Sequence, residues 1–311
     1  MLFVYNSLVV IMKYMWLFFA FLSPMFYGVA NIFDNFLVTK SFKNPATLVF
    51  YASLSSIVFV PTLSLFYDLS WPAISTFPIF IILGIINVSY LYPYYKGLQS
   101  DDTSTAVSFF SLGRIFIPIW AFLIVGERLS REEYLGMALI IIGAVLLSMK
   151  GHLKDIKFSK ALFYILLAAF IISFESVLLK YLFNQGVSVG NGVAGEMIAS
   201  ALCVFFLLFN KRIRTDIFEN FKNFKQKIPV FFAEEGATFI AFFSGSYALD
   251  KAPVSLVKSI TILSPFFVLL YAKVFGKKFP NFFNEQKGVG VTLKKVLLFS
   301  MITIGVVLVA R

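Results

Sequence analysis

The stretch that decides the fold is PIFIILGIINVSYLYPYYKGLQSDDTSTAVSFFSLGRIFIPIWAFLIVGE, residues 78–127. It occurs twice in the chain, because a gapless shift of 151 positions places Pro78 on Pro229 and Phe80 on Phe231. Each copy contains two long apolar segments joined by a short polar turn, so the chain is built from two related halves. The other identities pair Leu98 with Leu249, Ser104 with Ser255, Ser108 with Ser259, Leu112 with Leu263 and Ala121 with Ala272.

The composition predicts an all-α membrane protein. Of 311 residues, 59% are hydrophobic and only 14% are charged, and the mean hydropathy is +0.86. A soluble domain of this size has too little interior for so much apolar surface. Apolar segments of about 20 residues are long enough to cross a bilayer as helices. We predict ten transmembrane helices, over residues 14–38, 46–67, 78–99, 104–125, 133–150, 160–182, 190–210, 228–249, 254–275 and 293–310.

The distribution of the net charge of +11 predicts an orientation in the membrane. Most lysines and arginines lie in the loops that follow the odd-numbered helices, for example at Lys40, Lys96 and along 211–227. Cytoplasmic loops carry this excess in polytopic proteins. The pattern therefore predicts a protein of the inner (plasma) membrane whose odd-numbered loops lie in the cytoplasm. Because the positive charge is spread over loops on one side of the membrane, it also argues against a nucleic-acid partner.

The division into halves predicts a function. Residues 1–150 form the first five-helix repeat, with a short N-terminal extension over Met1–Met12, and residues 151–311 form the second. Because five is odd, the second repeat enters the membrane upside down relative to the first. Inverted repeats are typical of secondary transporters, whose substrate site lies near the midplane at the repeat interface. We therefore expect a small-molecule substrate, lipid on the outer surface, and a proton or counter-solute as a coupling partner.

Charged residues at membrane depth indicate where the site lies. Arg114 stands mid-helix in 104–125, where an arginine is costly unless it faces protein or water. Arg114 has three alternative roles: it binds an anionic group of the substrate, forms a gating ion pair, or forms a purely structural ion pair. Pro265 lies in the middle of 254–275 and predicts a kink or hinge. The candidates for substrate binding or proton coupling are Arg114, Asp34, Glu175, Lys180, Glu196, Glu235, Lys258 and Tyr90.

Several of these assignments have alternatives. Asp34 reaches either a cavity or the membrane interface. The tyrosines of Tyr90–Tyr95 form either an interfacial belt, which we favour for the set, or a cavity wall, and Tyr90 lies deeper than the others. Glu234 and Glu235 point about 100° apart, so only one is expected to face the cavity while the other pairs elsewhere, with Lys258 as a partner. The basic segment 211–227 is either a surface helix on anionic lipid or a solvated loop.

Other chemistries find little support. A single cysteine, Cys203, provides no disulfide framework or metal cluster, and the only histidine, His152, lies in a basic loop. We expect no cofactor, no metal and no removable signal peptide. An intramembrane protease could use Glu234 and Glu235, but Phe239 stands where that pattern needs an arginine. A non-transporting scaffold is the other alternative class.

The segment Tyr95–Glu127, which leads into Gly126-Glu127-Arg128-Leu129 and a glycine-containing helix, resembles the signature region of the EamA family in the drug/metabolite transporter superfamily. Pro265 is similar to that family's pattern as well. The resemblance implies ten helices and an exporter or exchanger of amino acids, nucleotides, sugars or other small metabolites, most often in a bacterial inner membrane. This chain departs from the pattern at Lys277-Lys278, at Arg114 in place of a proline, and in its charge bias.

Overall fold

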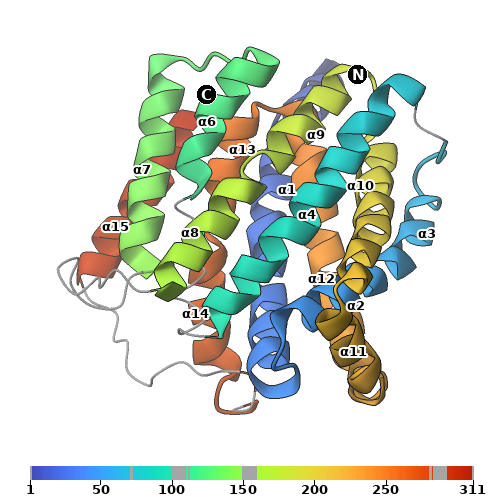
Figure 1. Cartoon of the computed structure of the whole chain (residues 1–311). Coiled ribbons are helices and arrows are strands. Elements are labelled where there is room, and N and C mark those ends of the chain that lie inside the picture. Colours follow the sequence, from blue (N-terminus) through green and yellow to red (C-terminus); the bar gives the residue numbers. More distant parts are fainter. Residues whose placement is uncertain are drawn as a thin grey trace.

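The computed structural model describes residues 2–70, 73–99, 110, 113–148, 160–279, 282 and 293–309. These residues form a bundle of helices that run roughly alongside one another, and no β-strand occurs among them (Figure 1). An all-helical bundle satisfies every backbone hydrogen bond within its own segments, as the apolar interior of a bilayer requires. The fold class predicted from the composition is therefore confirmed.

The helices of the first half are often interrupted by short 3₁₀ or π turns. In chain order the elements are α1 (Leu2–Phe36), η1 (Leu37–Ser41), α2 (Pro45–Ser56), η2 (Ile57–Phe59), α3 (Val60–Leu63), η3 (Ile74–Thr76), α4 (Phe77–Leu98), η4 (Gly113–Phe116), α6 (Ile117–Trp120), η5 (Ala121–Val125) and α7 (Arg131–Ser148).

The second half contains two helices that break within the expected span. Its elements are α8 (Lys160–Ile172), α9 (Glu175–Asn184), α10 (Val189–Cys203), η7 (Val204–Phe209), α11 (Lys211–Glu219), α12 (Phe221–Lys251), α13 (Val254–Thr261), α14 (Ser264–Phe275) and α15 (Leu293–Val309).

Seven segments are long and apolar enough to cross a membrane within the described ranges, and each overlaps one of the ten predicted helices. The other three predictions correspond to the η4–α6–η5 segment, to α7 and to α15. The number ten stays a prediction. The short N-terminal extension is helical in the structure, because α1 begins at Leu2 and continues through Lys13 to Phe36.

Pro265 occupies the first turn of α14, directly after a break in the helix. A proline cannot donate its backbone nitrogen, and its ring clashes with the carbonyl four residues earlier, which here belongs to Thr261. α13 ends at Thr261 for this reason, and α14 begins at Ser264. The kink expected at Pro265 is therefore present, while its role as a hinge stays a prediction.

The bundle is held together by close packing of small residues. α1 lies along α12, α4 lies against α8 and α10, and α7 lies along α15 at one side of the molecule (Figure 1). Between α7 and α15, a Cβ atom at Gly136 would come within 2.7 Å of the Gly305 carbonyl oxygen. Small residues let helix backbones approach closely where lipid removes the hydrophobic drive for association. α7 is therefore a helix that packs closely against α15.

The basic segment 211–227 is helical, as one of its two interpretations required. α11 begins after Asn210, whose side chain accepts from the backbone N–H groups of Arg212 and Ile213 at 3.0 and 3.3 Å. Ile217 is buried, whereas Phe218 is exposed. The Tyr51 hydroxyl donates to the Ile217 carbonyl, so α2 fixes the position of α11. Binding of this helix to anionic headgroups stays a prediction.

Candidate functional site

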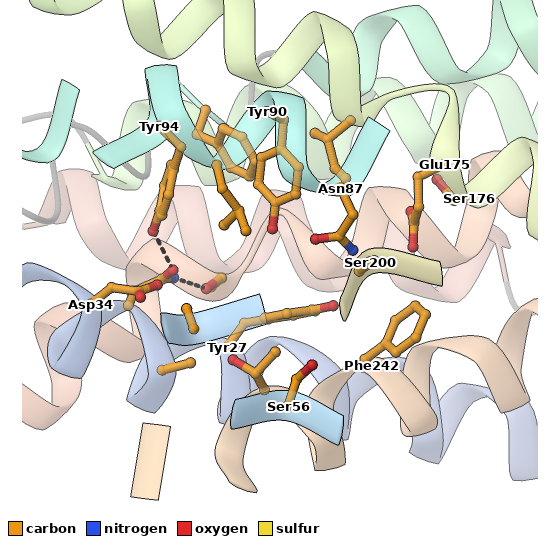
Figure 2. A pocket seen from close by; sticks show the side chains of 18 of the residues that line it. Tyr27, Asp34, Ser56, Asn87, Tyr90, Tyr94, Glu175, Ser176, Ser200 and Phe242 are labelled. Atoms are coloured by element: carbon orange, nitrogen blue, oxygen red, sulfur yellow. Dashed lines mark hydrogen bonds between the residues drawn. The ribbon is translucent and has the colours of Figure 1, made fainter. Parts of the chain in front are cut away.

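A cavity of about 170 Å³ lies between the two halves of the chain. Side chains from α1, α2, α4, α9, α10, α12 and α13 line it, so distant parts of the sequence meet there. Pockets for drug-sized ligands measure roughly 300–1,000 Å³, so this cavity fits a small metabolite. Figure 2 shows that Asp34 and Tyr94 lie toward one end and Glu175 and Ser176 toward the other.

One end of the cavity holds two cations and two carboxylates. Lys258 of α13 and Glu175 of α9 form an ion pair, with 3.5 Å between Nζ and Oε2. Arg114 interacts electrostatically with both Glu175 and Lys258. Glu196 of α10 accepts a hydrogen bond from the Asn87 side chain at 3.0 Å. We call Arg114, Lys258, Glu175 and Glu196 the balanced end, because its formal charges cancel.

Arg114 has unused hydrogen-bonding capacity at this end. Its Nε atom is buried and has no hydrogen-bond partner among the described residues. A buried polar group normally has a partner, and a guanidinium carries five donors in a planar fork. That fork matches a carboxylate or phosphate bidentately. Arg114 therefore has a free donor at the cavity, and its role in binding an anion stays a prediction.

The other end of the cavity contains carboxyl groups without a cation. Asp34 of α1 and Glu234 and Glu235 of α12 line it, and their exposed fractions are 7%, 4% and 5%. Electrostatic interactions connect the three groups with one another. Arg114 and Lys258 are the only lysine or arginine residues among the described lining residues, and both belong to the balanced end. We call Asp34, Glu234 and Glu235 the acidic end.

Aromatic and amide side chains separate the two ends. The Tyr94 hydroxyl donates to Asn31 Oδ1 at 2.7 Å, and Asn31 Nδ2 donates to Ser264 Oγ at 3.0 Å (Figure 2). Tyr27 and Tyr90 lie between Asp34 and Glu175 in the same view. The hydrogen-bonded bridge connects α4, α1 and α14, so it joins the two halves at the Asp34 end of the cavity.

The cavity brings together all but one of the residues singled out from the sequence. Lys180 lies elsewhere, and its ammonium donates to the carbonyls of Leu249, Asp250 and Ala252 at 2.7, 3.3 and 3.1 Å. It therefore caps the C-terminal end of α12, where a cation is favourable. The predicted candidates that line the cavity are Asp34, Tyr90, Arg114, Glu175, Glu196, Glu235 and Lys258.

Two expectations about side-chain direction were wrong. Glu234 and Glu235 both line the cavity, and Lys258 pairs with Glu175 instead of either glutamate. Adjacent residues diverge by about 100°, but a cavity that curves around a helix can reach both. Tyr94 and Tyr95, which were favoured as part of an interfacial belt, line the cavity together with the candidate Tyr90, whereas Tyr92 is 43% exposed. Asp34 faces the cavity, which settles the choice left open for it.

Sequence reasoning missed several lining residues. Tyr27, Asn31 and Asn87 were not predicted as site residues, although each is a polar side chain within an apolar helix. That feature was visible in the sequence, but single tyrosines and asparagines also occur at helix–helix contacts that bind no ligand. Whether they meet at one cavity depends on how each helix is rotated about its own axis. A helix that is apolar on all sides has no amphipathic stripe that would fix this rotation.

Gly126 and Glu127 connect the first half of the chain to α13 in the second. Gly126 ends the fourth segment in the left-handed region, with φ of 69°, where glycine has no steric cost. The chain then turns so that the Glu127 carboxylate accepts from the backbone N–H groups of Val254 and Ser255 at 2.7 and 3.1 Å. A carboxylate at a helix N-terminus is favourable. Glu127 of the first half thereby caps α13, the helix that carries Lys258.

We expect Glu127→Gln to lower the free energy of unfolding by about 1–2 kcal/mol, the usual loss for an N-cap. The amide offers one acceptor oxygen where the carboxylate offers two, and it lacks the negative charge. Thermal unfolding of the purified protein in detergent measures the change. The matched control is Glu132→Gln, because Glu132 is exposed in the first turn of α7. Equal melting temperatures for both variants would contradict the capping role.

The fold and the cavity define a class of protein: a multi-pass membrane protein with a polar cavity between two halves. The family model of the EamA-like transporter family matches residues 14–149 and 159–285, which is most of the chain. The protein therefore belongs to this family and to the drug/metabolite transporter superfamily. No protein of curated function matches the sequence.

Comparison with solved structures supports the fold. One of the similar chains, titled "Crystal structure of protein", has a TM-score of 0.60 and 16% sequence identity. The match covers 92% of this chain and 94% of that one. At this identity the likeness concerns the arrangement of helices alone, and it extends over nearly the whole of both chains.

Proposed function

We propose that this protein is a secondary transporter that moves small, amino-acid-like solutes across an inner membrane by alternating access, as an exporter or exchanger. Family membership supports transport in general. The observation that supports the substrate class is the balanced end of the cavity, where Arg114 can receive a carboxylate and Glu196, whose Oε2 atom has no hydrogen-bond partner among the described residues, can receive an ammonium group. Zwitterions carry both groups.

The division into residues 1–150 and 151–311 belongs to this proposal. The two segments matched by the family model fall on either side of residues 150–158, which supports two repeats. In an inverted pair, rocking of one repeat against the other opens the central site to each side in turn. Helix breaks at Ser173–Phe174 and before Pro265 lie beside the cavity and provide places for such motion. The odd-numbered loops would face the cytoplasm.

Solute efflux from reconstituted vesicles tests the proposal. Proteoliposomes are loaded with equal amounts of α-amino acids, of simple amines and of simple carboxylates, and the retained solutes are quantified by mass spectrometry. We expect selective loss of amino acids relative to protein-free vesicles, with or without a proton or sodium gradient. If no solute is lost selectively under any gradient, transport is refuted, and the buried charges are better explained as structural pairs of a membrane scaffold.

A further inference from the structure

The acidic end of the cavity has a charge pattern that the zwitterion proposal does not explain. A simple amino acid needs one carboxylate for its α-ammonium group, whereas Asp34, Glu234 and Glu235 provide three in addition to the balanced end. In a low-dielectric site like charges at short range repel strongly. This end therefore requires positive charge among its carboxyl groups whenever they are ionised.

The same groups have unsatisfied hydrogen-bonding atoms. Asp34 Oδ1 and Glu234 Oε2 are buried and have no hydrogen-bond partner among the described residues. Glu234 uses its other oxygen to accept from the Thr238 hydroxyl at 2.9 Å, which holds the carboxyl group in place. Buried acceptors without partners are uncommon and indicate a missing donor. Asp34 and Glu234 both line the cavity, so a ligand bound there can supply the donor.

The arrangement favours an organic cation over a metal ion. No group of three or more histidine, cysteine, aspartate or glutamate side chains within the described ranges is placed to hold a metal. An ammonium group has three donors that can point to separate acceptors, so it does not require the tight convergence of a coordination sphere. Tyr90, Tyr94 and Tyr95 also line the cavity, and aromatic faces attract organic cations.

Resting on the proposed function, we infer that Asp34, Glu234 and Glu235 form a subsite for a second, side-chain ammonium group, so that the preferred substrates are cationic amino acids. The α-carboxylate binds at Arg114, and the side chain crosses the tyrosine-lined middle of the cavity. Its terminal ammonium group donates to the unpartnered oxygens of Asp34 and Glu234. Asp34 and Glu175 lie toward opposite ends of the cavity in Figure 2, so such a side chain runs from one end to the other.

Three related compounds test the inference in wild-type proteoliposomes. Norleucine has the side chain of lysine without its terminal ammonium group, and cadaverine is lysine without its carboxylate. Exchange of labelled lysine is measured against each unlabelled compound. We expect the half-inhibiting concentration of lysine to be at least about tenfold lower than that of norleucine, because buried acceptors left unpaired discriminate strongly against an analogue that lacks the donor.

Substitutions then locate the discrimination. Asp34→Asn and Glu234→Gln are expected to remove most of the preference for lysine over norleucine, measured as the ratio of their half-inhibiting concentrations. Asp68→Asn is the control, because Asp68 is exposed outside the cavity and should leave the preference unchanged. Inhibition by cadaverine close to that by lysine would support the ammonium subsite and contradict carboxylate binding at Arg114.

The failures of the two proposals are distinguishable. If norleucine exchanges and competes as well as lysine, the ammonium subsite is refuted while transport of amino acids stands. If none of the three compounds exchanges and the mixed solute pool is also retained, the proposed function is refuted, and the inference falls with it. The comparison of lysine with norleucine uses only the wild-type protein, so its result does not depend on whether a variant folds.

Discussion

Exchange of amino acids by Arg114→Gln is expected to fall at least about 30-fold at low substrate concentration. Removing one partner of a buried, hydrogen-bonded charge pair costs about 2–5 kcal/mol, and 1.4 kcal/mol corresponds to a factor of ten. Glutamine keeps the two N–H donors of one amide nitrogen, but it has neither the positive charge nor the planar guanidinium fork that holds a carboxylate through two parallel hydrogen bonds. Initial exchange rates in proteoliposomes, measured at several substrate concentrations, give both affinity and maximal rate.

Two further variants separate binding from folding. Arg114→Lys keeps the charge without the fork and should give an intermediate affinity. Arg212→Gln removes an exposed arginine from the surface helix α11 and should exchange like the wild type. Gel filtration in detergent shows whether each variant remains folded. Unchanged affinity and rate in a folded Arg114→Gln protein would show that Arg114 does not contact the substrate.

Gly84→Val should lower the free energy of unfolding by about 2–3 kcal/mol, the upper part of the range for overpacking a tight interface. A Cβ atom at residue 84 would lie 2.6 Å from the carbonyl carbon of Ala199 and 2.7 Å from its oxygen. Both are backbone atoms, so α4 and α10 must separate to make room. Since Asn87 of α4 and Glu196 of α10 are hydrogen-bonded across this interface, the balanced end should be disturbed as well.

The neighbouring residue provides the matched control. Ile85 is 47% exposed on the outer surface of α4, so Ile85→Val should change stability little. Loss of monodisperse protein after heating, followed by gel filtration, compares the two variants with the wild type. If Gly84→Val melts at the wild-type temperature, the close approach of α4 and α10 is wrong.

Much of the fold could be predicted because membrane helices follow directly from chain chemistry. Apolar runs of sufficient length must be helical in lipid, and the repeat of residues 78–127 indicated two related halves. Family membership, now established over residues 14–149 and 159–285, agrees with the resemblance of the region around Gly126-Glu127. Because exposing a charged side chain to lipid is costly, Arg114, Asp34 and Glu196 were expected to face the protein interior, and all three line the cavity.

The errors share one physical cause. Helices that are apolar on nearly every side have no strong amphipathic stripe, so the sequence does not fix their rotation about their own axes. Three expectations depended on knowing that rotation. They were the pairing of Lys258 with a glutamate of α12, the inward direction of only one of Glu234 and Glu235, and the interfacial belt of tyrosines on α4. Lys180 was singled out because it falls opposite Asp34 when the start of residues 160–182 is aligned with the start of 14–38, whereas its ammonium group contacts the end of α12.

The sequence by itself determined the class of protein, the positions of most membrane helices, the break at Pro265 and the set of charged residues that must avoid lipid. These features depend on local composition and on neighbouring residues along the chain. Only the tertiary structure decided that the charges divide into a balanced end at Arg114 and an acidic end at Asp34. That division depends on how α1, α4, α9, α10, α12 and α13 rotate and pack, which close contacts between distant segments determine.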